Sequence, residues 1–568
     1  MNQPLSENVA SPRDPGFLRL AAHVFLLTVF ICSAFGALAS GAVCLILVRY
    51  GNWEGTRFAF KAALKLAGFA CLTGACGWLL IRPPRRESQG TGPLGAPPGP
   101  ADPKHTLALC GALALIVALV MPRLNEYPWA APDETHHLIV ARNLAEYGLY
   151  ASGQPETGFK VFDSYDSVGA PVIAPVAAMF RFWGSTLGAA RLVMAAYFLG
   201  LCGAAYLLLA NVFDAGAAIA GVLVMAMGFG SVYLGRTLYG EVPALAFLLT
   251  GLLLWRRAIQ GPKPGRDGFL AGVLFGLMVL CKSIAVLSAF AFLGAAIYDA
   301  LSYRRIKWAH LTAPALGGIL AIGLWWLIKA LAQQDVQAAA AGTLSEYRHN
   351  LMFGLRCARQ GLGWMLREPF TVAGLTCAMV WVLPLIFAKR YDPPSVVLFF
   401  MALFYAYWWL FFTPGHIPRY MWFTYAIAGL FAGAMAWSAL RLALHRGTGL
   451  GMRLVCAAGV LLVVGPAVAR TAETAGYVRT CDEMRDDYAV AQFVAGLPPE
   501  TPVATTYWPL ERTVNFVAHR AITSIDAIPG QFEPRAVTIV DARTQPCLTK
   551  DRLPMFRAGR YAILAPEH

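Results

Sequence analysis

Groups of ionisable residues interrupt the long apolar segments of this sequence, and each is of a type that can move a proton or hold an anion. Asp133 and Glu134 open the segment PWAAPDETHHLIVARNLAEYGLY, and Glu241 lies in GRTLYGEVPALAF. Lys282 lies in LFGLMVLCKSIAVLSAF, and Arg419 lies in TPGHIPRYMWF. A carboxylate can accept a proton from a hydroxyl group, whereas Lys and Arg side chains can pair with phosphate oxygens. These residue types therefore suit an anionic substrate and a proton transfer.

The Asp133-Glu134 pair has a structural interpretation beside the catalytic one. The residues that follow predict an amphipathic helix, and acids in its first turn would interact favourably with the helix dipole. That interpretation explains one acid well, but it does not explain His136 and His137 in an otherwise apolar segment. Both interpretations stay open on the residues alone.

Arg236, Glu241 and Lys282 lie where a bilayer would make charges costly. Such residues usually face a cavity or a partner. The ordinary alternative is that a long side chain reaches the membrane surface. This alternative fits Arg236 well but fits Lys282 poorly, because apolar runs flank Lys282 on both sides.

The remaining candidates are weaker. His416 and Tyr420 flank Arg419 at the start of an apolar segment, where Arg and Tyr are common interfacial residues. Tyr347 and His349 belong to a polar loop, which needs no functional cause. We keep all four as candidates for contact with an acceptor.

The composition indicates a polytopic α-helical membrane protein. Of the 568 residues, 57% are hydrophobic and only 14% are charged. A soluble enzyme is about half apolar and about a quarter charged, so that class is excluded. About 13 apolar segments are long enough to span a bilayer as helices. They cover residues 18–48, 59–81, 105–121, 188–210, 215–234, 242–258, 267–281, 284–301, 311–331, 370–388, 395–412, 420–441 and 453–470.

The distribution of charge predicts the orientation in the membrane. The net charge of +14 comes from basic clusters in short loops, which indicates cytoplasmic loops rather than a nucleic-acid site. These clusters are Arg82/Arg85/Arg86, Arg256/Arg257/Lys263/Arg266, Arg304/Arg305/Lys307, Lys389/Arg390 and Arg441/Arg446/Arg453. With a cytoplasmic N-terminus, the candidate residues all fall on the external side of the inner, or plasma, membrane.

The chain divides into four parts on this reading. A transmembrane hairpin (1–81) is followed by a Pro/Gly-rich cytoplasmic linker (82–104) that has the composition of a disordered segment. Residues 105–470 form the transmembrane catalytic domain, and residues 471–568 form a small external, periplasmic α/β domain. The catalytic domain carries two large external loops, 122–187 and 332–369. Cys481 and Cys547 of the tail are expected either to form a disulfide or to stay as two thiols.

The order of these motifs resembles the GT-C glycosyltransferases that use polyprenyl-phosphate sugars. This group includes the protein O-mannosyltransferases and the lipid A aminoarabinose transferases. The shared features are an Asp-Glu pair in the first external loop, an Arg-x-x-x-x-Glu/Asp-x-Pro turn, a Lys between short spans, a late Arg-Tyr pair and an external C-terminal domain. The resemblance covers roughly residues 105–568.

The resemblance implies a role for each matching residue. Asp133 matches the catalytic base and Glu134 its acidic neighbour, while Glu241 matches a second acidic site that supports the acceptor or a metal. Lys282 and Arg419 match the cations that hold the donor phosphate. At two positions this chain departs from the pattern of the aminoarabinose transferases. His136 stands where the aminoarabinose transferases commonly have Arg, Ser283 follows Lys282 where they have Gly, and Arg236 is the further phosphate-binding candidate.

These observations predict an inverting glycosyltransferase with a polyprenyl-phosphate sugar donor and a glycolipid, glycan or protein acceptor. The alternative is a transporter or flippase of an anionic lipid, which should show internal repeats and charges near the bilayer midplane. A ligase of lipid-linked polymers would depend on a large late external loop rather than on an early Asp-Glu pair. Carboxylates and His side chains are compatible with a divalent cation, but their spacing does not demand one. The sugar and the acceptor stay open.

Overall fold

The computed structural model of the chain describes residues 103–155, 158–162, 168–228, 230–302, 307–333, 374–376, 378, 392–412, 418–445, 448–524, 536–545 and 553–566. The predicted N-terminal hairpin and most of the predicted linker, second external loop and span 370–388 lie outside the described residues. The prediction of about 13 spans therefore stays a prediction.

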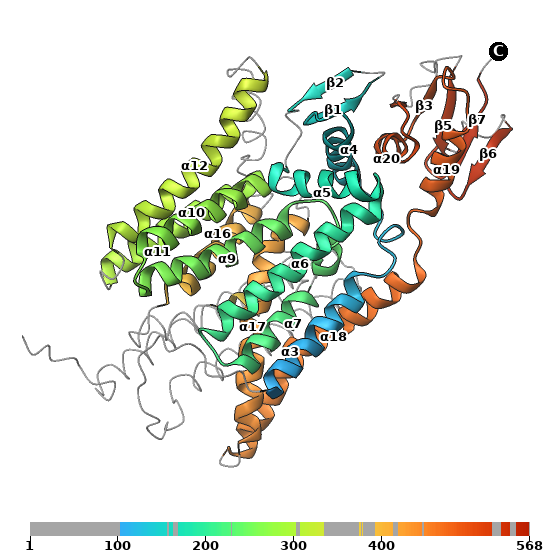
Figure 1. Ribbon diagram of the computed structural model, residues 1–568. Coiled ribbons are helices and arrows are strands. Elements are labelled where there is room, and N and C mark those ends of the chain that lie inside the picture. Colours follow the sequence, from blue (N-terminus) through green and yellow to red (C-terminus); the bar gives the residue numbers. More distant parts are fainter. Residues whose placement is uncertain are drawn as a thin grey trace, which may run out of the picture.

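The described part of the chain is a bundle of apolar helices that run back and forth between two ends (Figure 1). Among the described residues, 6 helices are long and apolar enough to cross a membrane, which agrees with a multi-pass membrane protein. The bundle comprises α3 (Pro103–Val120), α6 (Leu187–Ala210), α7 (Ala215–Ala226), α9 (Glu241–Gln260), α10 (Pro264–Cys281), α11 (Ser288–Ser302), α12 (Trp308–Gln333), α16 (Pro393–Phe412), α17 (Trp422–Leu444) and α18 (Leu450–Thr480).

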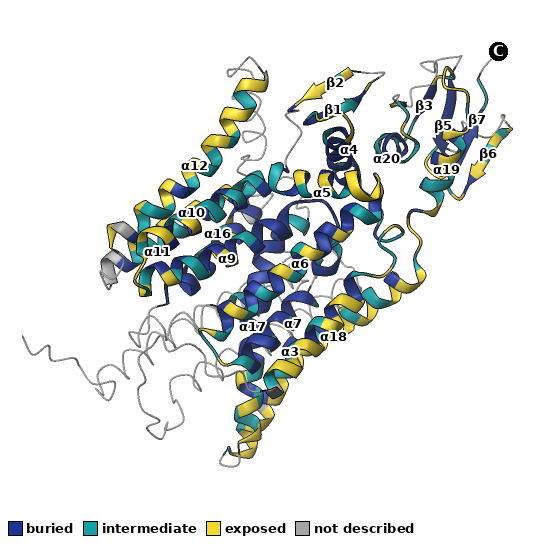
Figure 2. Ribbon diagram, viewed as in Figure 1, coloured by how far each residue is buried: buried dark blue, intermediate teal, exposed yellow. Residues whose placement is uncertain are grey.

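The helices differ in how much of their apolar surface other helices cover (Figure 2). In α9, 61% of the most apolar stretch is buried inside the protein, whereas in α12 the value is 6%. Lipid is as apolar as a protein core, so an apolar side chain can face either one. We infer that α9 and α17 form the centre of the bundle and that α12 and α18 expose wide faces to lipid.

Two of the predicted spans differ from the helices observed. The expected span 215–234 breaks after α7, and a short helix, α8 (Ser231–Leu234), follows the break. The expected span 453–470 is part of a 31-residue helix, α18, that continues to Thr480. The hydropathy of residues 471–480 falls, but the helix continues through them, so it extends beyond the apolar segment. At about 1.5 Å per residue, α18 is longer than the roughly 30 Å apolar layer of a bilayer.

The described residues of the large loop that follows α3 fold over one end of the bundle. It contains the predicted helix, α4 (Pro132–Tyr147), and an antiparallel hairpin of β1 (Ala151–Gln154) and β2 (Gly158–Val161). An apolar helix that the sequence analysis did not predict, α5 (Ala170–Trp183), completes it. Pro132 occupies the first turn of α4, where its missing N–H costs nothing, and Gly148 ends the helix in a left-handed conformation.

The C-terminal residues form a small α/β domain beside α4 (Figure 1). Its sheet has the order β4-β3-β5-β7-β6, with β3 parallel to β5 and β5 antiparallel to β7. The bounds of the elements are α19 (Arg485–Ala495), β3 (Val503–Thr505), α20 (Trp508–Ala518), β4 (Thr523–Ser524), β5 (Val537–Asp541), β6 (Pro554–Ala558) and β7 (Tyr561–Leu564).

Candidate active site

Asp133 and Arg419 form an ion pair between the first turn of α4 and a short 3-10 helix, η2 (Pro418–Met421), that precedes α17. The carboxylate side chain is 48% exposed, and the guanidinium is 17% exposed. Two aromatic rings hold the guanidinium from other sides, since its carbon lies 4.5 Å from the centre of the Tyr239 ring and 5.2 Å from that of Tyr420. Arg419 is thus fixed by cation–π contacts while its partner Asp133 stays accessible.

Glu241 and Lys282 form a second ion pair nearby. Glu241 is the first residue of α9, and Lys282 lies between α10 and a 3-10 helix, η1 (Ser283–Leu287). The Lys282 Nζ lies 3.7 Å from the Glu241 Oε1, and the side chains are 6% and 1% exposed. Neither Glu241 oxygen accepts a hydrogen bond from the described residues. Buried carboxylate oxygens normally have such partners, so the Glu241 carboxylate can still accept hydrogen bonds from a ligand.

Gly240 allows this second pair to form. Its φ is +85°, a left-handed conformation that side chains disfavour. A Cβ atom at this position would lie 2.3 Å from the carbonyl oxygen of Cys281, the residue before Lys282. The backbone of the turn before α9 therefore approaches the end of α10 closely because residue 240 has no side chain.

The two ion pairs belong to one electrostatic cluster. Glu241 acts on Arg419, and Lys282 acts on Asp133, through their charges. Burial alone would raise the pKa of the Asp133 carboxyl, but the Arg419 guanidinium, with help from Lys282, outweighs it and holds the pKa below its usual range. We call Asp133, Glu241, Lys282 and Arg419 the charge cluster.

Glu134 has a different environment from its neighbour Asp133. Its carboxylate accepts hydrogen bonds from Arg191 of α6 at 2.9 and 3.1 Å, and both side chains are 0% exposed. Arg191 also donates to the carbonyl oxygens of Leu124 and Pro128. Glu134 therefore fixes the start of α4 to α6 and to the preceding loop, and its catalytic role stays a prediction.

His137 is a residue of this site that the candidate set did not include. It lies one helical turn after Asp133, and its Nδ1 donates to the carbonyl oxygen of Leu238 at 3.1 Å. Burial, followed by the charges of His136 and Lys282, holds the pKa of His137 well below its usual value. The imidazole is therefore neutral, with the Nδ1 hydrogen in place. The spacing Asp133-x-x-x-His137 on one helix face was the signal available in the sequence.

The other predicted residues lie apart from the charge cluster or outside the described residues. His136 is buried with its ring edge-on to His137, at 5.8 Å between ring centres. Arg236 is fully buried, donates to the Pro122 carbonyl and stacks on a different ring, that of Tyr127. The phosphate-binding roles of both stay predictions. His416, Tyr347 and His349 fall outside the described residues, as does Cys547, so the choice between a disulfide and two thiols at Cys481 and Cys547 stays open.

The described residues do not assemble a metal site of the usual kind. Within the ranges that the structure covers, no three His, Cys, Asp or Glu side chains group as metal ligands. The two carboxylates of the charge cluster pair with Arg419 and Lys282 instead. A divalent cation at this site therefore stays a prediction for which these residues supply no ligand set.

The C-terminal domain holds the segment that leads to Asp133. The Trp129 indole donates to the Asp487 carboxylate at 2.9 Å, and the Trp129 backbone N–H donates to Glu483 at 2.6 Å. Arg512 of α20 donates to the carbonyl oxygen of Pro132, the residue before Asp133, at 3.3 Å. We call residues 122–132 the entry segment. Because the C-terminal domain forms hydrogen bonds with the backbone of the entry segment, the entry segment fixes where α4 begins.

A family model and solved structures resemble this chain. Residues 169–329 match the model described as dolichyl-phosphate-mannose-protein mannosyltransferase, and no curated protein sequence matches significantly. ArnT from Cupriavidus metallidurans, solved with undecaprenyl phosphate, is 14% identical with a TM-score of 0.56, over 82% of this chain and 98% of that chain. Its apo structure gives a TM-score of 0.54 at 14% identity, over 81% and 97%.

A second protein shows the same similarity of fold. AglB from Archaeoglobus fulgidus, described as an archaeal oligosaccharyltransferase, was solved with an inhibitory peptide and a dolichol-phosphate. It is 14% identical to this chain, with a TM-score of 0.51 over 78% of this chain and 70% of that chain. The chain therefore shares its fold with ArnT and AglB, which confirms the resemblance in fold that the sequence motifs indicated, and its long apolar helices are those of a multi-pass membrane protein.

Proposed function

We propose that this chain is an inverting glycosyltransferase that transfers a sugar from a polyprenyl-phosphate donor to an acceptor hydroxyl at the external face of the membrane. The observation that carries the proposal is the charge cluster, in which two accessible or unsatisfied carboxylates and two cations meet at one end of the bundle. ArnT and AglB, which share the fold, were solved with polyprenyl-type phosphates, and this supports the choice of donor.

In the proposed reaction, Lys282 and Arg419 bind the phosphate of the donor. The Asp133 carboxylate accepts the proton of the acceptor hydroxyl while the acceptor oxygen attacks the anomeric carbon. The bond from that carbon to the phosphate oxygen breaks, and the lipid phosphate leaves with the electron pair. The two cations stabilise the charge that develops on the leaving phosphate.

On this proposal, donor binding also changes the basicity of the Asp133 carboxylate. In the empty enzyme, Arg419 pairs with Asp133 and lowers the pKa of its carboxyl. A donor phosphate that competes for Arg419 would weaken this pair, and burial would then raise the pKa of Asp133. The carboxylate would become a stronger base only once the donor is in place.

The position of the charge cluster favours an enzyme over the alternative of a transporter. Asp133, Glu241 and Lys282 lie at or beyond helix ends, whereas a transport pathway would have its charges near the middle of the bundle.

The test is mass spectrometry of envelope glycolipids and glycoproteins from cells that lack the gene. We expect one sugar modification to disappear, and the parent gene to restore it. Asp133→Asn should fail to restore it, although the protein accumulates in the membrane. Asp214→Asn is the matched control, since Asp214 pairs with Arg441 at the other end of the bundle. Full restoration by Asp133→Asn would remove Asp133 from the mechanism.

A further inference from the structure

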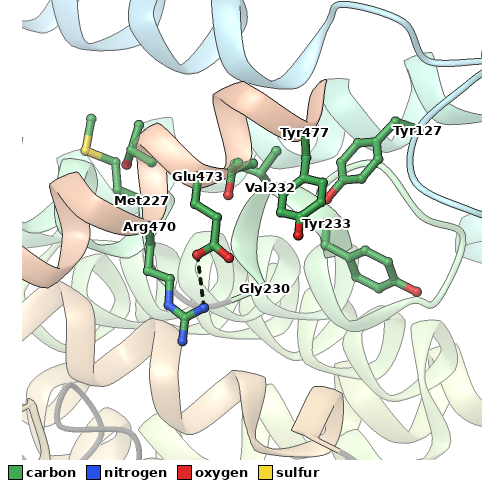
Figure 3. Close-up of a pocket in the computed structure, with 11 residues that line it drawn as sticks. Tyr127, Met227, Gly230, Val232, Tyr233, Arg470, Glu473 and Tyr477 are labelled. Atoms are coloured by element: carbon green, nitrogen blue, oxygen red, sulfur yellow. Dashed lines mark hydrogen bonds and ion pairs between the residues drawn. The ribbon is translucent and has the colours of Figure 1, made fainter. Parts of the chain in front are cut away.

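A cavity of about 180 Å³ with polar and apolar walls lies between α18 and the turn that joins α7 to α8 (Figure 3). None of the four residues of the charge cluster lines it. Six side chains supply most of its polar and aromatic wall. They are Tyr127, Tyr233, Arg470, Glu473, Thr474 and Tyr477.

The wall combines aromatic rings with groups that donate and accept hydrogen bonds. The Tyr127 and Tyr477 rings are nearly parallel, with 12° between their planes and 6.3 Å between their centres. Arg470 Nη1 and Glu473 Oε2 lie 3.3 Å apart on neighbouring turns of α18. One cation and one anion cancel, so this cavity does not select for a phosphate as Lys282 and Arg419 would. Donors and acceptors beside aromatic faces suit a neutral group with several hydroxyls.

Two tyrosines connect this cavity to the charge cluster. The hydroxyl oxygens of Tyr233, in the cavity wall, and Tyr239 are 3.3 Å apart. Tyr239 in turn contacts Arg419, whose guanidinium carbon lies 4.5 Å from the centre of the Tyr239 ring. Since Arg419 pairs with Asp133, contacts through Tyr233, Tyr239 and Arg419 link the cavity to the proposed base.

Arg236 supports the same side of the cavity. It is 0% exposed, its guanidinium carbon lies 5.4 Å from the centre of the Tyr127 ring, and its Nε and Nη1 have no hydrogen-bond partner among the described residues. Burial and the charge of Arg191 lower the pKa of Arg236 to about 10, which still leaves it charged at neutral pH. A buried cation with unused donors behind Tyr127 is costly unless something polar binds nearby.

Size and position limit what the cavity can hold. Its volume of about 180 Å³ is below the range of about 300–1,000 Å³ for sites that enclose a drug-sized ligand, so it fits a single sugar ring better than a whole lipid. Arg470 to Tyr477 lie in the last turns of α18, after its apolar stretch, and this places the cavity at the level of lipid head groups.

We infer that this cavity binds a sugar unit of the acceptor, so that the acceptor is a glycan or glycolipid rather than a protein. This inference rests on the proposed function, because it assigns the second substrate of the same reaction. The charge cluster holds the anionic donor, and the cavity holds a neutral, hydroxyl-rich part of the acceptor. Tyr233 and Tyr239 lie between the two sites.

The experiment measures binding and needs no sugar transfer. The full chain is reconstituted in nanodiscs free of sugar-based detergent, and neutral methyl glycosides of glucose, mannose and galactose are tested by saturation-transfer NMR. We expect at least one glycoside to bind. Glu473→Gln should weaken this binding by about tenfold, as expected for the loss of a charge-assisted hydrogen bond, and Tyr477→Ala should also weaken it.

Two controls keep the outcome clear. Asp214→Asn changes another carboxylate in an exposed Arg pair, 45% exposed against 52% for Glu473, and should bind glycosides like the parent. Equal thermal unfolding midpoints would show that the variants are folded. If Tyr477→Ala is not folded, Tyr477→Phe offers a milder change.

Glycoside binding that Glu473→Gln and Tyr477→Ala leave unchanged would overturn the inference, as would absence of binding to the parent. Binding of Ser- or Thr-containing peptides in place of glycosides, sensitive to Tyr477→Ala, would overturn it as well. Failure here is distinguishable from failure of the proposed function, which is judged by Asp133-dependent modification of the envelope.

Discussion

The Arg191 guanidinium and the Glu134 carboxylate share two hydrogen bonds in complete burial, while the adjacent acid, Asp133, is 48% exposed and pairs with Arg419. Successive residues of one helical turn thus point their carboxylates to different partners. Glu134 fixes the turn, and this leaves Asp133 in a defined position with an accessible carboxylate. Of the two acids, one therefore supports the helix, and the other is the group that we propose to be reactive.

Glu134→Gln should destabilise the protein strongly. It leaves the buried Arg191 without a countercharge, a change that typically costs about 3–5 kcal/mol. Thermal unfolding in nanodiscs would measure the loss. Asp214→Asn, in an exposed pair with Arg441, should cost no more than about 1 kcal/mol. Equal midpoints for the two variants would contradict the supporting role of Glu134.

Arg419→Met should move the acid limb of the pH–rate profile to higher pH. With Arg419 present, the pKa of Asp133 is below its usual range, so the ionised carboxylate and the stability of its ion pair persist as pH falls and are lost only below that range. Without Arg419, burial dominates and raises the pKa of the carboxyl. Transfer rates measured against pH would check this, with Arg441→Met as the control. An unshifted acid limb would show that Arg419 does not set the pKa of Asp133.

Lys282→Met should weaken donor binding, and it should also lower the thermal unfolding midpoint, because it leaves the buried Glu241 carboxylate without its countercharge. The expected loss is about 1.5–3 kcal/mol, the range for a hydrogen bond to a charged group. Lys282→Arg should restore binding only in part, since a planar guanidinium does not replace a compact ammonium. Binding of undecaprenyl phosphate to the purified protein measures the effect, and Lys263→Met, an exposed change, is the control. Parent-like binding by Lys282→Met would mean that Lys282 does not contact phosphate.

Cysteine labelling would test the proposed sidedness. Lys160 in β2 and Lys263 before α10 are both exposed. In intact cells, a maleimide that cannot cross the membrane should label Lys160→Cys above the parent background but should not label Lys263→Cys. Lysis should then make both sites reactive. Labelling of Lys263→Cys alone in intact cells would reverse the orientation and place the charge cluster in the cytoplasm.

The sequence predicted the members of the charge cluster among other candidates, but not their pairing. Glu241 and Lys282 stand out because charges beside apolar segments are costly, whereas Asp133 and Arg419 gained their roles from the family resemblance. Their partners could not be deduced from spacing, since the residues of each ion pair come from different helices. The prediction of α4 succeeded because its periodicity is local.

The residues that sequence reasoning missed depend on distant contacts. Arg191, at the start of an apolar segment, has the pattern of a side chain that reaches the membrane surface, and its partner Glu134 is 57 positions away. Arg236 fitted the same interpretation, yet it is 0% exposed. Helix α5 was missed because its apolar residues lie inside a long loop, where a stretch too short to span a bilayer carries no clear signal.

Because the C-terminal domain binds the entry segment, these two parts of the chain form one unit for protein engineering. Trp129 and the Pro132 carbonyl bond to Asp487 and Arg512, which lie more than 350 positions later in the chain. A chimaera that exchanged residues 471–568 alone would match each new tail with an unrelated entry segment. A tail from another protein should therefore be transplanted together with that protein's own counterpart of residues 122–132. For the same reason, a truncated chain that ends at residue 470 should not serve as a minimal enzyme.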